Sequence, residues 1–247
     1  MKGQQSNSGV YIYADFRDNL IIDRYDPIFQ NMRAQKINHL RSENSEDAIT
    51  WNVFRTMQQI DPKIWLPRLF QISFNEQLQL NSDIVKVILW KSIEPPKSLE
   101  TKEGPSEVDI IIETEEFVWS IEAKYKSDIS KKTTHDPNRN QIIRNIDVGS
   151  HYAKNKDFYF SLLILDEQYS PIGFSLIEKY IKSKDSILDH LLHRKGTDPL
   201  NNVKEIGFLT WGNIRRILEE CAQVVSRDYE RYVANQAIEW LDQKGIL

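Results

Sequence analysis

Residues 105–126 read PSEVDIIIETEEFVWSIEAKYK, and this stretch decides the fold. Residues 108–113 alternate around isoleucines, residues 117–124 are rich in aromatic and β-branched side chains, and Thr-Glu-Glu at 114–116 is a polar break between them. This pattern predicts two short β-strands joined by a tight turn. An antiparallel hairpin is the simplest interpretation.

The register of the hairpin decides which side chains face each other. If Glu115 and Glu116 form a two-residue loop, the numbers of directly opposed residues sum to 231. One face of the hairpin is then apolar. Its pairs are Val108 with Ala123, Ile110 with Ile121, and Ile112 with Trp119.

The other face of the hairpin carries charge. Asp109 opposes Glu122, and the two-residue period of a strand places Lys124 beside Glu122. Opposed carboxylates, about 4.5–5.5 Å apart at Cβ, repel each other. A divalent cation between the two carboxylates would replace this repulsion by attraction to the cation, because hard cations such as Mg²⁺ bind carboxylate oxygens. Lys124 would add positive charge within reach of an attacking water or a phosphate oxygen, and a register slip of one residue would break this arrangement.

At these residues the sequence resembles the PD-(D/E)XK nuclease superfamily, whose core is a hairpin with an acid on one strand and acid-any-lysine on the next. The match is Asp109 followed by Glu122-Ala123-Lys124, with Pro105 four residues before Asp109 instead of directly before it. A second such triplet, Glu100-Thr101-Lys102, follows a proline pair where no strand is expected. The resemblance covers roughly residues 42–165.

A helix is predicted over residues 42–60. Ser45 can cap its first amides, and Glu46 falls in the first turn, where an acid favours the helix dipole. Glu46 also lies on the stripe that faces the core. As a first-turn acid alone it would be ordinary, but the resemblance implies an acid on this helix that completes a metal cluster. Glu46 matches that position, and Glu43 is the reserve candidate.

The resemblance implies that Asp109, Glu122 and Glu46 hold one or two Mg²⁺ ions, with the Ala123 carbonyl as a further ligand and Mn²⁺ as a substitute ion. It also implies that Lys124 orients or deprotonates the attacking water.

A basic stretch follows Lys124 directly. It could contact phosphates, although lysine-rich segments are also common on solvated surfaces. Asp136-Pro137 then predicts the start of a helix that runs to about residue 153. In the resembled superfamily this helix often carries a glutamine and a basic or aromatic residue facing the site, which implies roles for Gln141 and Arg144. Solvated polar side chains are the alternative, above all for Arg144. The tentative phosphate contacts are Lys126, Lys131, Lys132, Arg139 and Arg144.

Further elements complete the predicted order. Strands are expected at 84–90, 158–165 and 205–210, and helices at 25–40, 174–193 and 211–241. Residues 61–82 are predicted to be a connection, in which 69–74 could form a short strand. The order predicts an α/β fold with a mixed central β-sheet flanked by helices. The resemblance implies a restriction-endonuclease-like core at 42–210, with an N-terminal extension at 1–41 that packs on the core and C-terminal helices at 211–247.

Composition limits the classes of protein that fit. The 247 residues are 40% hydrophobic, enough for a sizeable core. The net charge of -4 gives no global basic field of the kind that sequence-general nucleic-acid binders often carry. The one cysteine, Cys221, excludes an internal disulfide and a cysteine-cluster zinc site, and suits a reducing cytoplasm. The N-terminus lacks the apolar run of a signal peptide, and no stretch is apolar enough to suggest a membrane protein.

The sequence therefore predicts a cytoplasmic, Mg²⁺-dependent nuclease that hydrolyses phosphodiester bonds, most directly an endonuclease for double-stranded DNA. The resemblance alone suggests a restriction or defence role, and a homodimer or a partner subunit is a further expectation. Motifs for other chemistries, such as GxxxxGK, GxSxG and HExxH, are absent from the sequence. Two alternatives stay open: a catalytically inactive module of the same fold that binds nucleic acid or protein, and an unrelated α/β interaction protein whose Asp109 and Glu122 are solvated strand acids.

Overall fold

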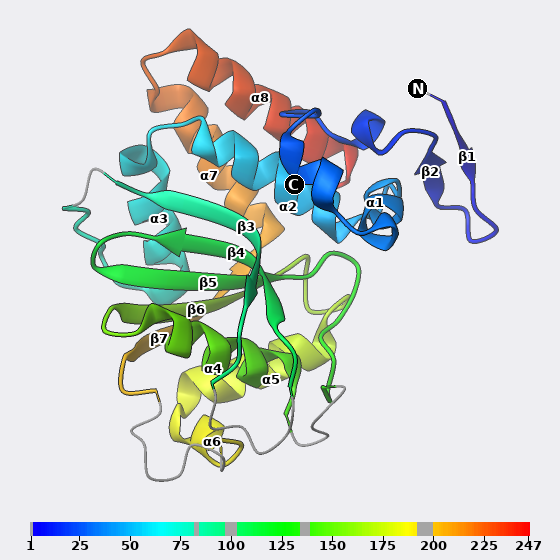
Figure 1. Ribbon diagram of the computed structural model, residues 1–247. Helices are drawn as coiled ribbons and strands as arrows, with labels where there is room; N and C mark the ends of the chain where they lie inside the picture. The colour runs from blue at the N-terminus through cyan, green and yellow to red at the C-terminus, as the bar shows by residue number, and fades with distance from the viewer. Residues whose placement is uncertain (1, 82–83, 97–102, 134–138, 192–199) are drawn as a thin grey trace. The chain divides into compact units, whose positions relative to one another are not determined.

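Figure 1 shows the computed structural model of the chain. It describes residues 2–81, 84–96, 103–133, 139–191 and 200–247. The triplet Glu100-Thr101-Lys102 and the helix start predicted at Asp136-Pro137 lie outside these residues.

A five-stranded sheet forms the centre of the fold, in the order β3 (Lys86–Ile93), β4 (Ser106–Glu113), β5 (Phe117–Ala123), β6 (Asp157–Ile164) and β7 (Val203–Thr210). The pairs of β4 with β3 and with β5 are antiparallel, whereas β6 is parallel to β5 and β7. The predicted mixed sheet of an α/β fold is thus confirmed. The strands predicted around 84–90, 108–113, 117–124, 158–165 and 205–210 are present, with ends shifted by at most three residues.

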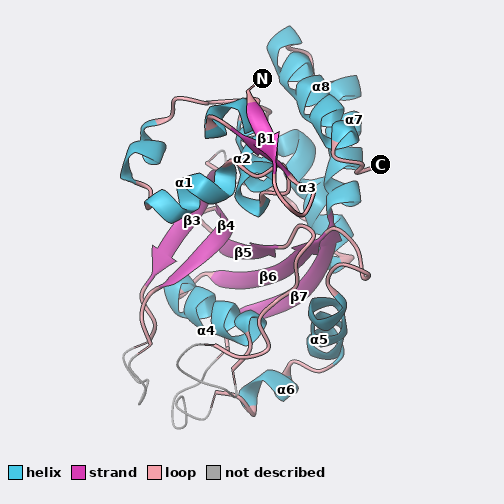
Figure 2. Cartoon of the chain, turned by 90° about the vertical axis from the view of Figure 1, so that its right-hand side faces the viewer, coloured by secondary structure: helices cyan, strands magenta, loops and turns pink. Residues whose placement is uncertain are grey.

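Helices cover both faces of this sheet (Figure 2). On one face, Phe70 and Phe74 of α3 (Pro62–Phe74) place their ring centroids 5.7 and 5.0 Å from that of Trp119 on β5. On the other face lie α4 (Gln141–Ala153) and α5 (Pro171–Lys182), followed by the short helix α6 (Asp185–Leu188). A Cβ atom at Gly149 of α4 would lie 2.5 Å from Phe158 Cζ, so only glycine allows α4 to approach β6 this closely.

The connection predicted at 61–82, with its short strand, is wrong for residues 62–74, because they form α3. Pro62 occupies the start of this helix, where the missing N–H costs nothing. Buried apolar residues then follow at helical spacing, at Trp65, Leu66, Leu69 and Phe70. This spacing outweighs the internal Pro67.

The chain divides into two compact units, residues 67–211 with the sheet and residues 1–66 with 212–247. In the second of these, α2 (Glu46–Gln58) packs against α1 (Ala34–Leu40) and α8 (Asp228–Gln243). The division differs from the predicted boundary at residue 42, since residues 42–66 group with the chain ends. The remaining elements of this unit are β1 (Gly3–Gln5), β2 (Tyr11–Tyr13), η1 (Phe16–Asn19), η2 (Pro27–Asn31) and most of α7 (Trp211–Val224).

Capping residues set the positions at which α2 and α4 begin. Ser45 caps α2 as predicted, because its Oγ accepts a hydrogen bond from Ala48 N at 3.1 Å. α4 begins later than predicted, because Arg139 and Asn140 are not helical and Asn140 is the cap, accepting from Ile143 N at 3.0 Å. The helix expected at 25–40 is broken into η2 and α1. Among the helices described, none has the length and apolar character needed to cross a membrane.

Candidate functional site

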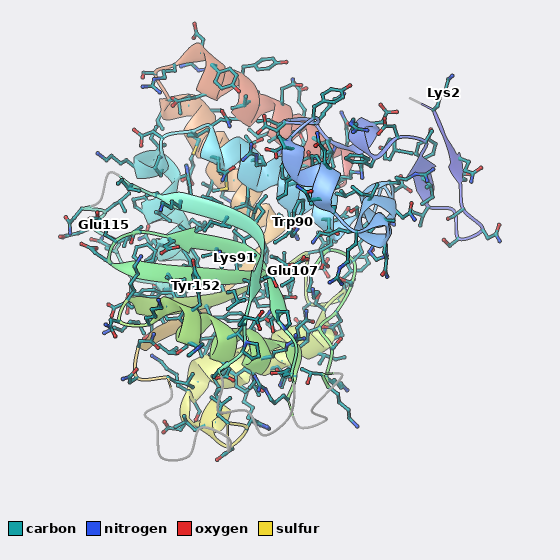
Figure 3. The ribbon with its side chains drawn as sticks, in the orientation of Figure 1. Lys2, Trp90, Lys91, Glu107, Glu115 and Tyr152 are labelled. Carbon is teal, nitrogen blue, oxygen red and sulfur yellow. The ribbon has the colours of Figure 1, made fainter. Side chains whose placement is uncertain are left out.

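The hairpin of β4 and β5 has the predicted register. Ile110 pairs with Ile121 and Ile112 with Trp119, so the opposed numbers sum to 231. The loop is closed by Thr114, whose N–H donates to Phe117 O at 3.0 Å and whose Oγ1 accepts from Phe117 N at 3.1 Å. Figure 3 shows Glu115 at this turn and Glu107 toward the opposite end of β4.

The backbone pairing of β4 with β5 ends at Ile110 and Ile121, before the predicted pairs of Val108 with Ala123 and Asp109 with Glu122. Beyond that point a side chain takes over, since Asp109 Oδ2 accepts a hydrogen bond from Ala123 N at 3.0 Å. The Asp109 carboxylate is therefore fixed to the residue that follows Glu122. The predicted pairing of Asp109 with Glu122 is therefore not part of the ladder, and Asp109 is instead hydrogen-bonded to the neighbouring residue Ala123.

Glu122 is a buried acid with several polar partners. Its side chain is 2% exposed, and the Lys124 ammonium lies 2.7 Å from its Oε1. From α4, Gln141 Nε2 donates to Oε1 and Asn145 Nδ2 donates to Oε2, each at 2.5 Å. A buried carboxylate needs such partners, because burial without them is costly. Three groups thus hold the glutamate in one position.

Asn145 is a site residue that the sequence reasoning missed. It follows Gln141 by four residues, and side chains four apart lie on the same face of a helix. That spacing was the available signal, because an amide at 145 had to face the same acid as an amide at 141. The orientation of the Gln141 amide is fixed by Ser130, whose backbone N–H donates to Gln141 Oε1 at 3.2 Å.

Lys124 is locked in place by its backbone. Its N–H donates to Leu163 O on β6 at 2.7 Å, and its carbonyl accepts from Trp211 Nε1 at 3.0 Å. The ammonium also donates to Ala123 O at 2.9 Å. It lies within hydrogen-bonding distance of two predicted metal ligands, the Glu122 carboxylate and the Ala123 carbonyl. These oxygens therefore already converge on a positive charge.

The predicted phosphate contacts separate into two groups. Lys126, Lys131 and Lys132 are exposed. Arg139, in contrast, is 1% exposed, and its guanidinium pairs with Asp147 at 2.9 Å and with Glu103 at 3.2 Å. The phosphate contact of Arg139 stays a prediction, and in this structure its buried guanidinium is paired with carboxylates. Arg144 is about a quarter exposed and donates to the Pro105 carbonyl at 3.3 Å.

Glu46 and Glu43, the two acids predicted near the start of the first long helix, belong to the unit formed by residues 1–66 and 212–247. Glu46 is half-buried at the first position of α2, and its role as a metal ligand stays a prediction. Glu43, the reserve candidate, has a structural partner, since its Oε1 accepts from Tyr11 N at 2.6 Å.

The donor set fits a hard cation only in part. Among the residues with a described position, no group of three or more His, Cys, Asp or Glu side chains gathers to bind a metal. The available oxygens are the Glu122 carboxylate and the Ala123 carbonyl, both within reach of Lys124, and the Asp109 carboxylate, which is bonded to Ala123 N. Oxygen ligands of this kind suit Mg²⁺ or Mn²⁺, and Mg²⁺ is commonly bound through one or two carboxylates while it keeps several waters.

Comparison with protein-family models, with curated proteins and with solved structures gives no match for this chain. Its chemistry must be inferred from its own side chains. These are the buried carboxylate of Glu122 with its three donors, the carboxylate of Asp109 hydrogen-bonded to Ala123 N, and the buried Lys124 ammonium between the Glu122 carboxylate and the Ala123 carbonyl.

Proposed function

We propose that this chain is a metal-dependent phosphodiesterase acting on nucleic acid, most directly a DNA endonuclease with a restriction-endonuclease-like core. The observation that supports this most is the position of the Lys124 ammonium, 2.7 Å from Glu122 Oε1 and 2.9 Å from Ala123 O. The acid-any-lysine triplet of the sequence therefore folds into one compact cluster, and Asp109 is bonded to its central residue.

The roles follow from the oxygens and donors present. Asp109, Glu122 and the Ala123 carbonyl would hold Mg²⁺ or Mn²⁺, with Glu46 as a further proposed ligand. A bound ion of this kind lowers the pKa of a coordinated water and neutralises charge on the phosphate under attack. Gln141 and Asn145 keep the Glu122 carboxylate oriented, because both amides donate to it.

In the proposed reaction the Lys124 side chain would have to move. Its ammonium now neutralises Glu122, and a flexible four-carbon stem allows it to turn toward a substrate when another cation takes over that task. There it would orient the attacking water and balance the charge of the phosphate. The exposed Lys126, Lys131 and Lys132 remain proposed contacts to the nucleic-acid backbone.

A second function is favoured by the same contacts. Lys124, Gln141 and Asn145 occupy three of about four acceptor positions of the Glu122 carboxylate, and Lys124 balances its charge. Such a cluster is complete without a metal. The chain would then be a binding module that keeps the fold, contacts nucleic acid or another protein, and cleaves nothing.

Cleavage of plasmid DNA tests the first proposal. Linear, nicked and supercoiled DNA are incubated with the protein and Mg²⁺ or Mn²⁺, beside Asp109→Ala, Glu122→Ala and the control Glu107→Ala, an exposed acid of the same strand. We expect metal-dependent cutting by the wild type and the control, and none by the two site variants. Cutting that survives in Asp109→Ala and Glu122→Ala would contradict the proposed site, and binding without cutting by every form would favour the binding module.

A further inference from the structure

A buried group of charges lies beside the candidate site. It contains Arg139, Arg144, Glu103 and Asp147, and the side chains of Arg139, Glu103 and Asp147 are at most 1% exposed. Arg139 Nη2 donates to Asp147 Oδ2 at 2.9 Å, which is a well-made hydrogen bond. Asp147 alone therefore balances the charge of Arg139.

The second carboxylate of the group, Glu103, is held far less well. It lies 3.2 Å from Arg139 Nη1 and 3.8 Å from Arg144 Nε. Yet neither of its oxygens has a hydrogen-bond partner among the described residues, and the same holds for the buried Nε and Nη1 of Arg139 and Nε of Arg144. Buried polar groups without hydrogen bonds are rare and costly. Two arginines thus present unused donors to an anion that does not satisfy them.

The location of these donors connects them to the proposed chemistry. Arg144 stands three residues after Gln141 and directly before Asn145 on α4, and both amides donate to Glu122. Arg144 therefore projects from the same part of α4 as the two amides that hold Glu122.

We propose that Arg139 and Arg144 form a phosphate subsite, that the Glu103 carboxylate fills it in this structure, and that a phosphate of the nucleic acid displaces Glu103. This rests on the proposed function. A phosphate offers more acceptor oxygens than a carboxylate, and guanidinium groups bind it through paired, charge-assisted hydrogen bonds. It can therefore satisfy donors that Glu103 leaves unused.

Binding of a short DNA duplex, followed by fluorescence anisotropy in EDTA to prevent cleavage, tests the proposal. Glu103→Gln removes the competing charge and should tighten binding about tenfold. The matched control Glu107→Gln changes the net charge equally at an exposed position and should shift affinity about twofold or less, because solvent and salt screen it. Adding Arg144→Gln to Glu103→Gln should abolish the gain. Equal effects of Glu103→Gln and Glu107→Gln would overturn the subsite.

Inorganic phosphate separates the subsite from the nuclease proposal. Titration calorimetry with phosphate alone should show tighter binding to Glu103→Gln than to the wild type, and loss of that binding when Arg144→Gln is added. If phosphate behaves in this way while no variant binds DNA, the subsite stands and the nucleic-acid substrate is wrong. If phosphate binding is the same in Glu103→Gln, Glu107→Gln and wild type, the subsite is wrong whether or not the protein cuts DNA.

Discussion

At the scale of single residues, the buried ion pair of Glu122 with Lys124 affects the stability of the protein as well as the proposed site. Both side chains are less than a tenth exposed, so removing one partner leaves the other charged and buried. We expect Lys124→Ala to lower the free energy of unfolding by about 3 kcal/mol. Glu122→Gln with Lys124→Ala should cost less than the sum of the single changes, because no buried charge remains. Urea denaturation of the four forms measures this, and additive losses would contradict the coupling.

The stability of the protein should depend on pH through Glu113, which lies at the end of β4. Burial acts to raise its pKa, but hydrogen bonds from Lys156 and Tyr152 outweigh burial and leave the pKa below its ordinary 4.5. The resulting stabilisation is present above pH 4.5 and is lost as the pH falls through the lower folded-state pKa. Denaturation from pH 2 to 7 should show wild type more stable than Glu113→Gln near neutrality. The two should converge in acid, and a difference that grows as pH falls would contradict this.

Cys221 on α7 is a core thiol, as its apolar helical stripe predicted. It is 1% exposed, and burial raises its pKa to about 12. A thiolate is the reactive form of cysteine. Ellman's reagent should therefore leave the native protein unlabelled and label one thiol per chain in denaturant. Rapid labelling of the native protein would show that this segment opens.

At the scale of elements, the approach of α4 to the sheet sets the site, because Gln141 and Asn145 reach Glu122 from this helix. Gly149→Ala would place a methyl group against the Phe158 ring and push the helix away. We expect a loss of about 1–3 kcal/mol in stability. The control Gly104→Ala has nothing within 4 Å of its added Cβ and should be neutral. Equal stability of the two variants, measured by thermal unfolding, would contradict the packing.

The elements also show why prediction from sequence succeeded in some places and failed in others. The hairpin was predictable because its polar turn and two-residue period fix the register locally. α3 was missed because two prolines obscured an apolar spacing that only packing against the sheet makes decisive. The hydrogen bond from Ala123 N to Asp109 and the burial of Arg139 depend on contacts between residues that are not neighbours in the sequence. No local sequence pattern indicates them.

At the scale of the whole molecule, the predicted role of Glu46 as a metal ligand needs a test of its own. Asp109, Glu122 and Lys124 belong to residues 67–211, whereas Glu46 belongs to the other unit. If Glu46 is a ligand, Glu46→Ala should weaken Mg²⁺ binding about tenfold or more. The neighbouring acid Asp47, which pairs with Lys36 at 3.1 Å, provides the control Asp47→Ala. Equal Mg²⁺ affinities of these two variants would remove Glu46 from the site.

Titration calorimetry of the intact protein with Mg²⁺ and with Mn²⁺ tests the central claim most directly, because every proposed step depends on a cation held by Asp109 and Glu122. The wild type should bind one or two ions, and the binding should disappear in Asp109→Asn and in Glu122→Gln but persist in Glu107→Gln. Binding that is absent from the wild type, or unchanged by Asp109→Asn and Glu122→Gln, would contradict the account.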